Sequence, residues 1–244
     1  MEKCKQTLDL YYTLKTIIPE LMCGWDVNEP WFDTIVKHVY AFPMPSMTTD
    51  LDRISVYGFV GYDGKDFDFW EFFKLVLIGF EIRINEDYNL KDIFVIDFKN
   101  CTLGHVAKFT LPLMKKFELC FMRGYHSRLR GIHYINTPPY AEFVVAIVKT
   151  VMKSKLVSRI HVHGTDLTEF YKRVPKELLP EEMGGTSGTI QENWSRWQKK
   201  MKSYRDCLVK RENMKSDESK RPHEKLNSSE LFGFEGSFRK MNMD

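Results

Sequence analysis

The stretch Leu129-Arg-Gly-Ile-His-Tyr-Ile135 has the composition of a strand, and Thr137-Pro138 directly after it can open a helix. Apolar residues then recur at the spacing of one helix face; they are Tyr140, Phe143, Val144, Ile147, Val148, Val151 and Met152. Arg159-Ile-His-Val-His163 reads as a second short strand, which Gly164 ends. A strand, a helix and a strand in succession predict a crossover between parallel strands.

The remaining pattern extends this unit in the N-terminal direction. Ile54–Val60 is strand-like and runs into a turn at Gly61–Gly64, whereas Asp92–Asp97 is an apolar run between charges, typical of a strand covered on both faces. Helices are predicted over residues 4–18, over Phe69–Ile84, and from Thr110 to just before Gly124. Residues 19–50 look turn-rich because of their prolines. The fold class is therefore α/β with a mostly parallel sheet.

Length and composition limit the class of protein. The 244 residues are 43% hydrophobic and 14% aromatic, which excludes a disordered chain. Five widely spaced cysteines without a CxxC motif indicate reduced thiols. No segment approaches the roughly 18–20 apolar residues that span a bilayer, and the first residues lack a signal-peptide core. We therefore expect a cytoplasmic protein.

No enzyme motif stands out. The sequence has no GxSxG, no GxxxxGK[ST] and no HExxH, so we assign no catalytic residue, no metal and no cofactor. His161 and His163 could share one side of a strand, but no acidic or Cys residue is clustered with them, and a structural role is favoured. Packing is likewise favoured for the Cys101 and His105 pair.

The segment from Lys199 to Lys225 is basic, with ten Lys/Arg against five Asp/Glu. It could contact anionic lipid or nucleic acid, but a solvated polar tail is the favoured interpretation. Aromatic residues are not interleaved with its basic ones, so we expect no nucleic-acid partner.

Several motifs in order resemble the CRAL-TRIO family, the retinaldehyde- and tocopherol-transfer-protein-like lipid carriers. They are Arg53–Asp63, Arg130–Pro138 with the helix after it, Arg159–Gly164 and Leu179–Gly185. The closing Leu231–Lys240 resembles the C-terminal signature of the arthropod branch.

The resemblance also implies a division of the chain. Residues 1–20 would be a remnant of an N-terminal helical domain of which most is missing, and 21–50 a connecting segment. Residues 51–185 would form the lipid-binding domain, followed by a polar C-terminal tail, 186–244, that carries the terminal motif.

The family fold implies a sheet that floors an apolar pocket, with Pro139–Val157 as a mobile amphipathic gate helix. By position, the implied pocket residues are Ile78, Ile96, Phe117, Cys120, Phe121, Tyr125, Leu129 and Ile132, and the gate adds Phe143, Val144, Ile147, Val148 and Val151. Cys120 and Tyr125 could orient a hydroxyl or carbonyl of a ligand, whereas we expect Asp92, near the rim, to be solvated.

The resemblance further implies a basic cleft for phosphoinositide headgroups, formed here by Arg128, Arg130, Lys155 and Arg159. The guanidinium of Arg pairs well with phosphate. The function it implies is non-enzymatic transfer of a retinoid, tocopherol, other isoprenoid or phospholipid, with release when a peripherally contacted membrane opens the gate. The alternative is a phosphoinositide-sensing adaptor that transfers no ligand. The oligomeric state is left open.

Overall fold

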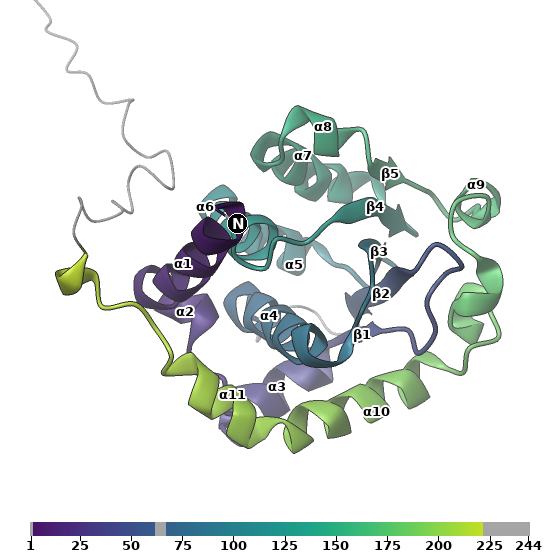
Figure 1. The fold of residues 1–244 in the computed structure, drawn as a ribbon. Helices are drawn as coiled ribbons and strands as arrows, with labels where there is room; N and C mark the ends of the chain where they lie inside the picture. Colours follow the sequence, from purple (N-terminus) through teal and green to yellow (C-terminus); the bar gives the residue numbers. More distant parts are fainter. Residues whose placement is uncertain (1, 62–66, 222–244) are drawn as a thin grey trace, which may run out of the picture.

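The computed structural model describes residues 2–61 and 67–221. The expected turn at Gly61–Gly64 falls largely outside these residues, and the motif Leu231–Lys240 falls wholly outside them. A five-stranded sheet with the order β1-β2-β3-β4-β5 forms the centre (Figure 1). Its strands are β1 (Val39–Pro43), β2 (Asp52–Phe59), β3 (Lys91–Asp97), β4 (Leu129–Ile135) and β5 (Ile160–Val162).

All neighbouring strands pair in parallel except β1, which runs antiparallel to β2. The predicted α/β class with a mostly parallel sheet is thus confirmed. The crossover between β4 and β5 is the one that the apolar stripe predicts, because Ile132 pairs with Ile160 and Tyr134 with Val162. Parallel neighbours need a long crossover connection, usually a helix, because the chain leaves one strand at the edge of the sheet opposite to that at which the next strand begins.

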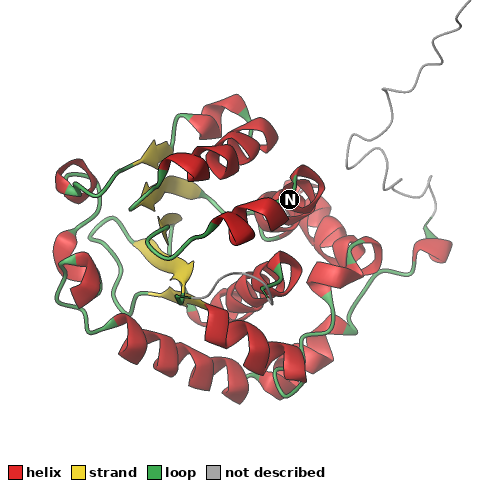
Figure 2. Ribbon diagram, turned by 180° about the vertical axis from the view of Figure 1, so that it is seen from behind, coloured by secondary structure: helices red, strands yellow, loops and turns green. Residues whose placement is uncertain are grey.

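Helices surround the sheet, and Figure 2 shows the same arrangement from behind. Among the described helices, none has the length and apolar content needed to cross a bilayer. The longer ones are α1 (Glu2–Ile17), α3 (Pro30–His38), α4 (Phe69–Glu86), α6 (Leu111–Glu118), α7 (Glu142–Val151), α10 (Ile190–Ser203) and α11 (Arg205–Glu212). The shorter ones are α2 (Pro19–Met22), α5 (Leu103–Lys108), α8 (Ser154–Val157), α9 (Thr168–Tyr171), the π-helical turn η1 (Leu119–Gly124), and the 3₁₀ turns η2 (Pro139–Ala141), η3 (Lys176–Leu178), η4 (Glu181–Met183) and η5 (Glu218–Lys220).

Helix α4 is the central helix of the molecule. The side chain of Asp68 accepts a hydrogen bond from the amide of Trp70 and so caps its first turn. Most residues from Phe69 to Arg83 are buried, as expected for a helix that is apolar on nearly every side. The predicted helix over Phe69–Ile84 is confirmed, and α4 continues two residues further.

Residues 19–50 differ from the turn-rich segment that the prolines suggested. Pro30 lies in the first turn of α3, where its missing amide hydrogen costs nothing, and Pro43 ends the edge strand β1. Phe32 and Ile35 of α3 and most of β1 are buried. The prolines therefore mark the ends of ordered elements rather than a loop.

The expected polar tail is also corrected. Residues 190–212 form α10 and α11, and α10 packs against β1 and α4. Trp194, Met201 and Leu208 repeat every seven residues and are buried. Because polar and charged residues fill most of the other positions, this narrow apolar stripe is inconspicuous in the sequence, although its spacing follows one helix face.

Candidate functional site

An apolar cavity of about 120 Å³ lies between the sheet and α4, α6 and α7. The floor comes from alternate residues of three parallel strands, Tyr57, Phe94, Ile96, Ile132 and Tyr134, which share one face of the sheet. The walls include Phe69, Phe72, Phe73, Val76 and Phe80 of α4, Val106 and Phe109, Met114, Phe117 and Phe121, and Val144 and Val148 of α7.

Aromatic rings occupy much of the space between these elements. The rings of Phe73 and Phe117 are stacked, with centroids 4.0 Å apart and planes at 14°. Phe121 lies parallel to Phe117, at 5.8 Å, and meets Phe80 edge-on at 4.9 Å. A cavity of about 150 Å³ takes up a molecule the size of benzene. A larger apolar ligand therefore requires these rings or α7 to move.

Six of the thirteen expected pocket residues line this cavity: Ile96, Phe117, Phe121, Ile132, Val144 and Val148. Ile78, Cys120 and Leu129 are buried but lie outside its lining. On α7, Phe143 is 57% exposed, while Ile147 and Val151 are partly buried beside the core and do not line the cavity.

Tyr125 points to another part of the molecule. Its hydroxyl donates a hydrogen bond to Glu81 Oε2 at 2.8 Å. It follows the π-helical turn η1, in which the backbone takes more residues per turn than an α-helix. The turn changes the direction of the side chains after it, so that Tyr125 faces α1 and α4.

The segment that covers the cavity has the bounds of the expected gate, Pro139–Val157, but is divided rather than one continuous helix. It consists of the turn η2, the helix α7, a non-helical break at Met152 and Lys153, and the short helix α8. Val144 and Val148 of α7 face the cavity, whereas Ala146 on the outer side is exposed. The cover is therefore amphipathic, as its sequence pattern predicts.

The four expected basic residues gather at the amino end of β4 and β5. Arg128 immediately precedes β4, Arg130 is its second residue, Lys155 belongs to α8, and Arg159 immediately precedes β5. The guanidinium of Arg159 donates a hydrogen bond to the carbonyl of Leu129, which ties this residue to the start of β4. Arg128, Arg130 and Lys155 are exposed.

Arg130 is held by two carboxylates. Its guanidinium lies 3.5 Å from Asp50 Oδ2 and 3.7 Å from Asp52 Oδ2. Asp52 is buried, and its amide is bonded to Thr48 Oγ1. Burial raises the pKa of Asp52, and the positive charge of Arg130 offsets only part of this effect. Any anion that binds Arg130 must compete with both carboxylates.

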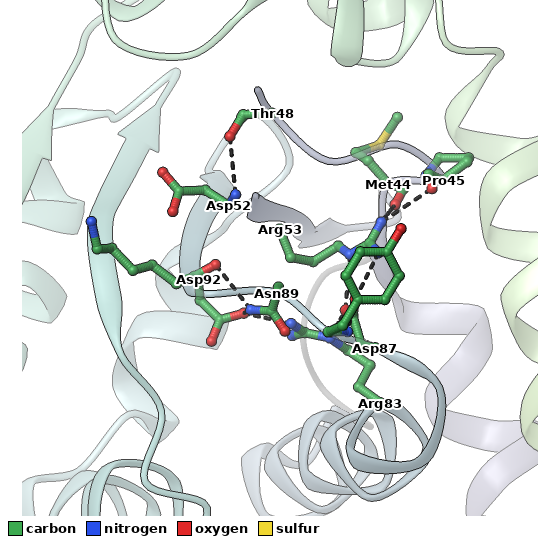
Figure 3. Close-up of polar contacts among 11 residues, drawn as sticks. Met44, Pro45, Thr48, Asp52, Arg53, Arg83, Asp87, Asn89 and Asp92 are labelled. Atoms are coloured by element: carbon green, nitrogen blue, oxygen red, sulfur yellow. Dashed lines mark hydrogen bonds and ion pairs between the residues drawn. The ribbon is translucent and has the colours of Figure 1, made fainter. Parts of the chain in front are cut away.

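A buried ion-pair network lies beside these residues (Figure 3). Arg83 Nη2 contacts Asp92 Oδ1 at 2.6 Å, and Asp87 accepts from both Arg83 and Arg53. The expectation that Asp92 is solvated is therefore wrong. Arg83 and Ser127 each donate a hydrogen bond to one of its two carboxylate oxygens. Burial would raise the pKa of Asp87, but the hydrogen bonds from Arg53 and the charge of Arg83 outweigh it and lower that pKa. The network fixes the amino ends of β2 and β3 to the end of α4.

A comparison with protein-family models matches residues 37–185 to the CRAL/TRIO domain. This range holds the sheet, the cavity and the basic residues. The chain belongs to the CRAL/TRIO family. The motif on which the resemblance to the arthropod branch depends lies outside the described residues, so the branch stays a prediction, as does the loss of an N-terminal domain.

Three relatives illustrate the position of this CRAL/TRIO chain. It is 28% identical over 118 residues to human "Alpha-tocopherol transfer protein-like", which covers 48% of this chain and 34% of that protein. It is 25% identical over 160 residues to rat "Clavesin-2", covering 63% and 49%. The chain thus spans about a third to a half of the curated relatives that it matches. The crystal structure of Sfh5 shares the fold, with a TM-score of 0.51 at 13% identity over 72% of this chain and 64% of that one.

On the opposite face of the sheet, the CRAL/TRIO domain carries three neighbouring histidines. His133 pairs in register with His161, and its Nδ1 lies 3.2 Å from Nε2 of His163. His161 and His163 thus share one face, as their spacing suggests. Burial, together with the two other rings and Arg173, lowers the pKa of His133 to about 3. Among the described residues, no group of three or more His, Cys, Asp or Glu is arranged to hold a metal ion.

Proposed function

We propose that this chain binds a small hydrophobic ligand beneath α7 and carries it between membranes. The observation that carries the proposal is the nearly uniform apolar lining of the cavity, which lies under one amphipathic helix. Such a site suits a retinoid, a tocopherol, another isoprenoid or the acyl part of a phospholipid. The names of the tocopherol-transfer-like relatives support the same class of ligand.

Burial supplies the affinity in this proposal. Covering a few hundred Å² of ligand at about 25 cal/mol per Å² corresponds to roughly 5–10 kcal/mol, before the cost of ordering the ligand is subtracted. The cavity of about 120 Å³ is smaller than such a ligand, so α7 moves outward on entry. The break between α7 and α8 at Lys153 is where this movement is accommodated.

We place release at the basic end of β4 and β5. Phosphoinositide headgroups bind Arg128, Arg130, Lys155 and Arg159 during transient peripheral contact. Lys155 lies on α8, directly after the α7 cover, and Arg159 lies at the start of β5. A headgroup that draws Lys155 toward Arg130 therefore acts at the base of the gate. No catalytic step is involved.

The test is transfer of a fluorescent tocopherol or retinoid from the protein to vesicles with and without phosphatidylinositol bisphosphate. The variant Arg130→Ala/Lys155→Ala is expected to slow transfer to the phosphoinositide vesicles several-fold and to leave ligand affinity unchanged. A matched control is Lys99→Ala/Lys172→Ala, which removes two exposed charges from elsewhere. Equal transfer by both variants would contradict the release mechanism.

The phosphoinositide-sensing adaptor remains the second candidate because the cavity is small. Deleting the basic segment Lys199–Lys225 would not test it cleanly, since this removes the buried Met201 and Leu208. Filling the cavity does test it. If the chain is an adaptor, a variant with a filled cavity keeps its phosphoinositide binding and its cellular partner. If the chain is a carrier, the same variant loses its transfer activity.

A further inference from the structure

A second hollow lies between α1 and α11, apart from the cavity beneath α7. Its volume is about 540 Å³, within the range of roughly 300–1,000 Å³ typical of small-molecule sites. We call it the α1–α11 groove. Both helices run along the same side of the molecule in Figure 1. The groove is lined by Thr7, Leu8, Tyr11, Tyr12, Lys15, Ile84, Gly124, Tyr125, Cys207, Lys210, Arg211 and Met214.

The rim of the groove is apolar and open to solvent. Leu8 is 58% exposed, Ile84 53% and Met214 43%. Single exposed apolar residues are common, but three that converge on one groove mark a surface that gains by being covered. Residues Thr7 to Lys15 extend this surface along about 12 Å of helix α1.

The charges on the groove wall all have one sign. Lys15, Lys210 and Arg211 line it, and no carboxylate does so among the described residues. Glu81 and Glu212, the two carboxylates that act electrostatically on Lys15, already have hydrogen-bond partners. Glu81 is fully buried and accepts from Tyr11, Tyr125 and Arg211. Glu212 accepts from the amide of Trp25 at 2.7 Å.

Lys15 is the unusual member of this set. Its side chain is buried, and its ammonium donates to Tyr11 Oη and to the carbonyl of Arg211, both at 2.8 Å. Within the described part of the chain, no carboxylate lies within 4.0 Å of it, because Arg211 takes the adjacent Glu81. The Tyr11 and Trp25 rings lie 4.3 and 5.0 Å from this ammonium, and the charges of Glu81 and Glu212 act on it from further away. Burial nevertheless outweighs these contacts and lowers the pKa of Lys15, so an anion in the groove would further stabilise its charged form.

We propose that the α1–α11 groove binds one long-chain fatty acid. Its carboxylate faces the Lys15, Lys210 and Arg211 end, and its acyl chain covers Leu8, Tyr12, Ile84 and Met214. The positive wall selects against a neutral alcohol of the same length, and the apolar rim selects against a small hydrophilic anion. The inference does not depend on the proposed transfer function, because the two hollows share no lining residue.

The test is binding of sodium oleate to the delipidated full chain at concentrations below those at which oleate forms micelles. The location is read from maleimide modification of Cys207, which lines the groove, with the exposed Cys4 as an internal control. Oleate is expected to slow modification of Cys207 and not of Cys4. Oleyl alcohol at the same concentration is expected to slow the modification of Cys207 at least about fivefold less than oleate does, because an alcohol cannot form the charge-assisted contacts.

Two variants of exposed residues complete the test. Lys210→Glu and Leu8→Asp are expected to weaken oleate binding roughly fivefold to tenfold, since each places a negative charge on the groove. Lys199→Ala on α10, also exposed, is the control and leaves binding unchanged. Lysophosphatidic acid distinguishes a carboxylate from a phosphate headgroup, and tighter binding of that lipid than of oleate would overturn the fatty-acid assignment.

Three other outcomes would overturn the proposal. Oleate binding that both variants leave unchanged would place the fatty acid elsewhere, beneath α7 for example. Equal protection by oleyl alcohol would remove the role of the charges. A Cys207 that is unreactive before any lipid is added would show that another part of the chain covers the groove. Loss of neutral-lipid transfer, by contrast, would concern the proposed function alone.

Discussion

The rings of Phe73 and Phe117 stack at 4.0 Å, and this contact joins α4 to α6 across the wall of the cavity beneath α7. It fills space that a bulky ligand would need. A bulky ligand must therefore displace part of the packed aromatic wall, so the packing that stabilises the wall lowers the affinity of the cavity for apolar molecules.

Removing one of these rings should lower the stability of the wall and at the same time ease entry of a ligand. Phe117→Ala is expected to lower the free energy of unfolding by about 2 kcal/mol, because a partly buried phenyl group is lost and a larger cavity remains. The same change is expected to speed uptake of a tocopherol or retinoid. Urea denaturation and the rate of ligand-fluorescence increase measure the two effects. Slower uptake would contradict a filling role for the stack.

Filling the cavity from the side of α7 has the opposite effect. Val144→Phe/Val148→Phe places two phenyl groups toward the lining and is expected to reduce ligand binding at least about tenfold, since an overpacked site has no room for a ligand. Ala146→Phe on the exposed side of the same helix is the control. Binding that the filled variant retains would place the ligand outside this cavity.

Much of the site follows from the sequence because its pattern is periodic. The stripe on α7 repeats at helical spacing, which puts Val144 and Val148 on one face of the helix, and both line the cavity. The floor is less predictable from single positions. Ile96 of β3 and Ile132 of β4 line the cavity, but Leu129, the first residue of β4, does not. The register of β3 and β4 shifts between Asp92 and Ile93, and no local pattern announces that shift.

Other features depend on partners that are distant along the chain. Glu81 is buried in α4 because Arg211 and Tyr11 reach it from the two ends of the sequence. Tyr125 turns away from the cavity after a π-helical turn that a helix-period argument does not detect. The run of aromatic residues from Phe67 to Phe80 is consistent with an aromatic cavity wall, but the same run is equally typical of an ordinary hydrophobic core.

The two carboxylates at Arg130 should restrain the binding of anionic membranes. Asp50→Asn/Asp52→Asn frees the guanidinium and is expected to raise affinity for phosphoinositide vesicles about threefold to fivefold. The variant should remain folded, since burial already raises the pKa of Asp52 and its charged form is disfavoured in the native state. Vesicle co-sedimentation measures the effect. Unchanged affinity would show that Arg130 does not contact the headgroup.

The histidines behind the sheet should make stability depend on pH. In the unfolded chain His133 takes up a proton near its ordinary pKa of about 6.5, whereas in the folded chain its pKa is lowered to about 3. The folded state therefore loses stability as the pH falls from about 6.5 toward 3. The loss from this residue is on the order of a few kcal/mol.

Urea denaturation at pH 7.5, 6 and 5 measures this dependence. His133→Gln is expected to flatten it relative to the unchanged chain. His126→Asn is the control, because His126 is exposed and has φ of 51°, a conformation that Asn tolerates. Equal slopes for both variants would assign the acid sensitivity to other groups.

The most direct test of the central claim is native mass spectrometry of the purified chain before and after incubation with retinoids, tocopherols and phospholipids, with organic extraction of whatever is bound. A carrier is predicted to hold one apolar molecule per chain, and the Val144→Phe/Val148→Phe variant is predicted to hold none. A folded chain that stays empty with every one of these lipids would contradict the transfer function and favour the adaptor.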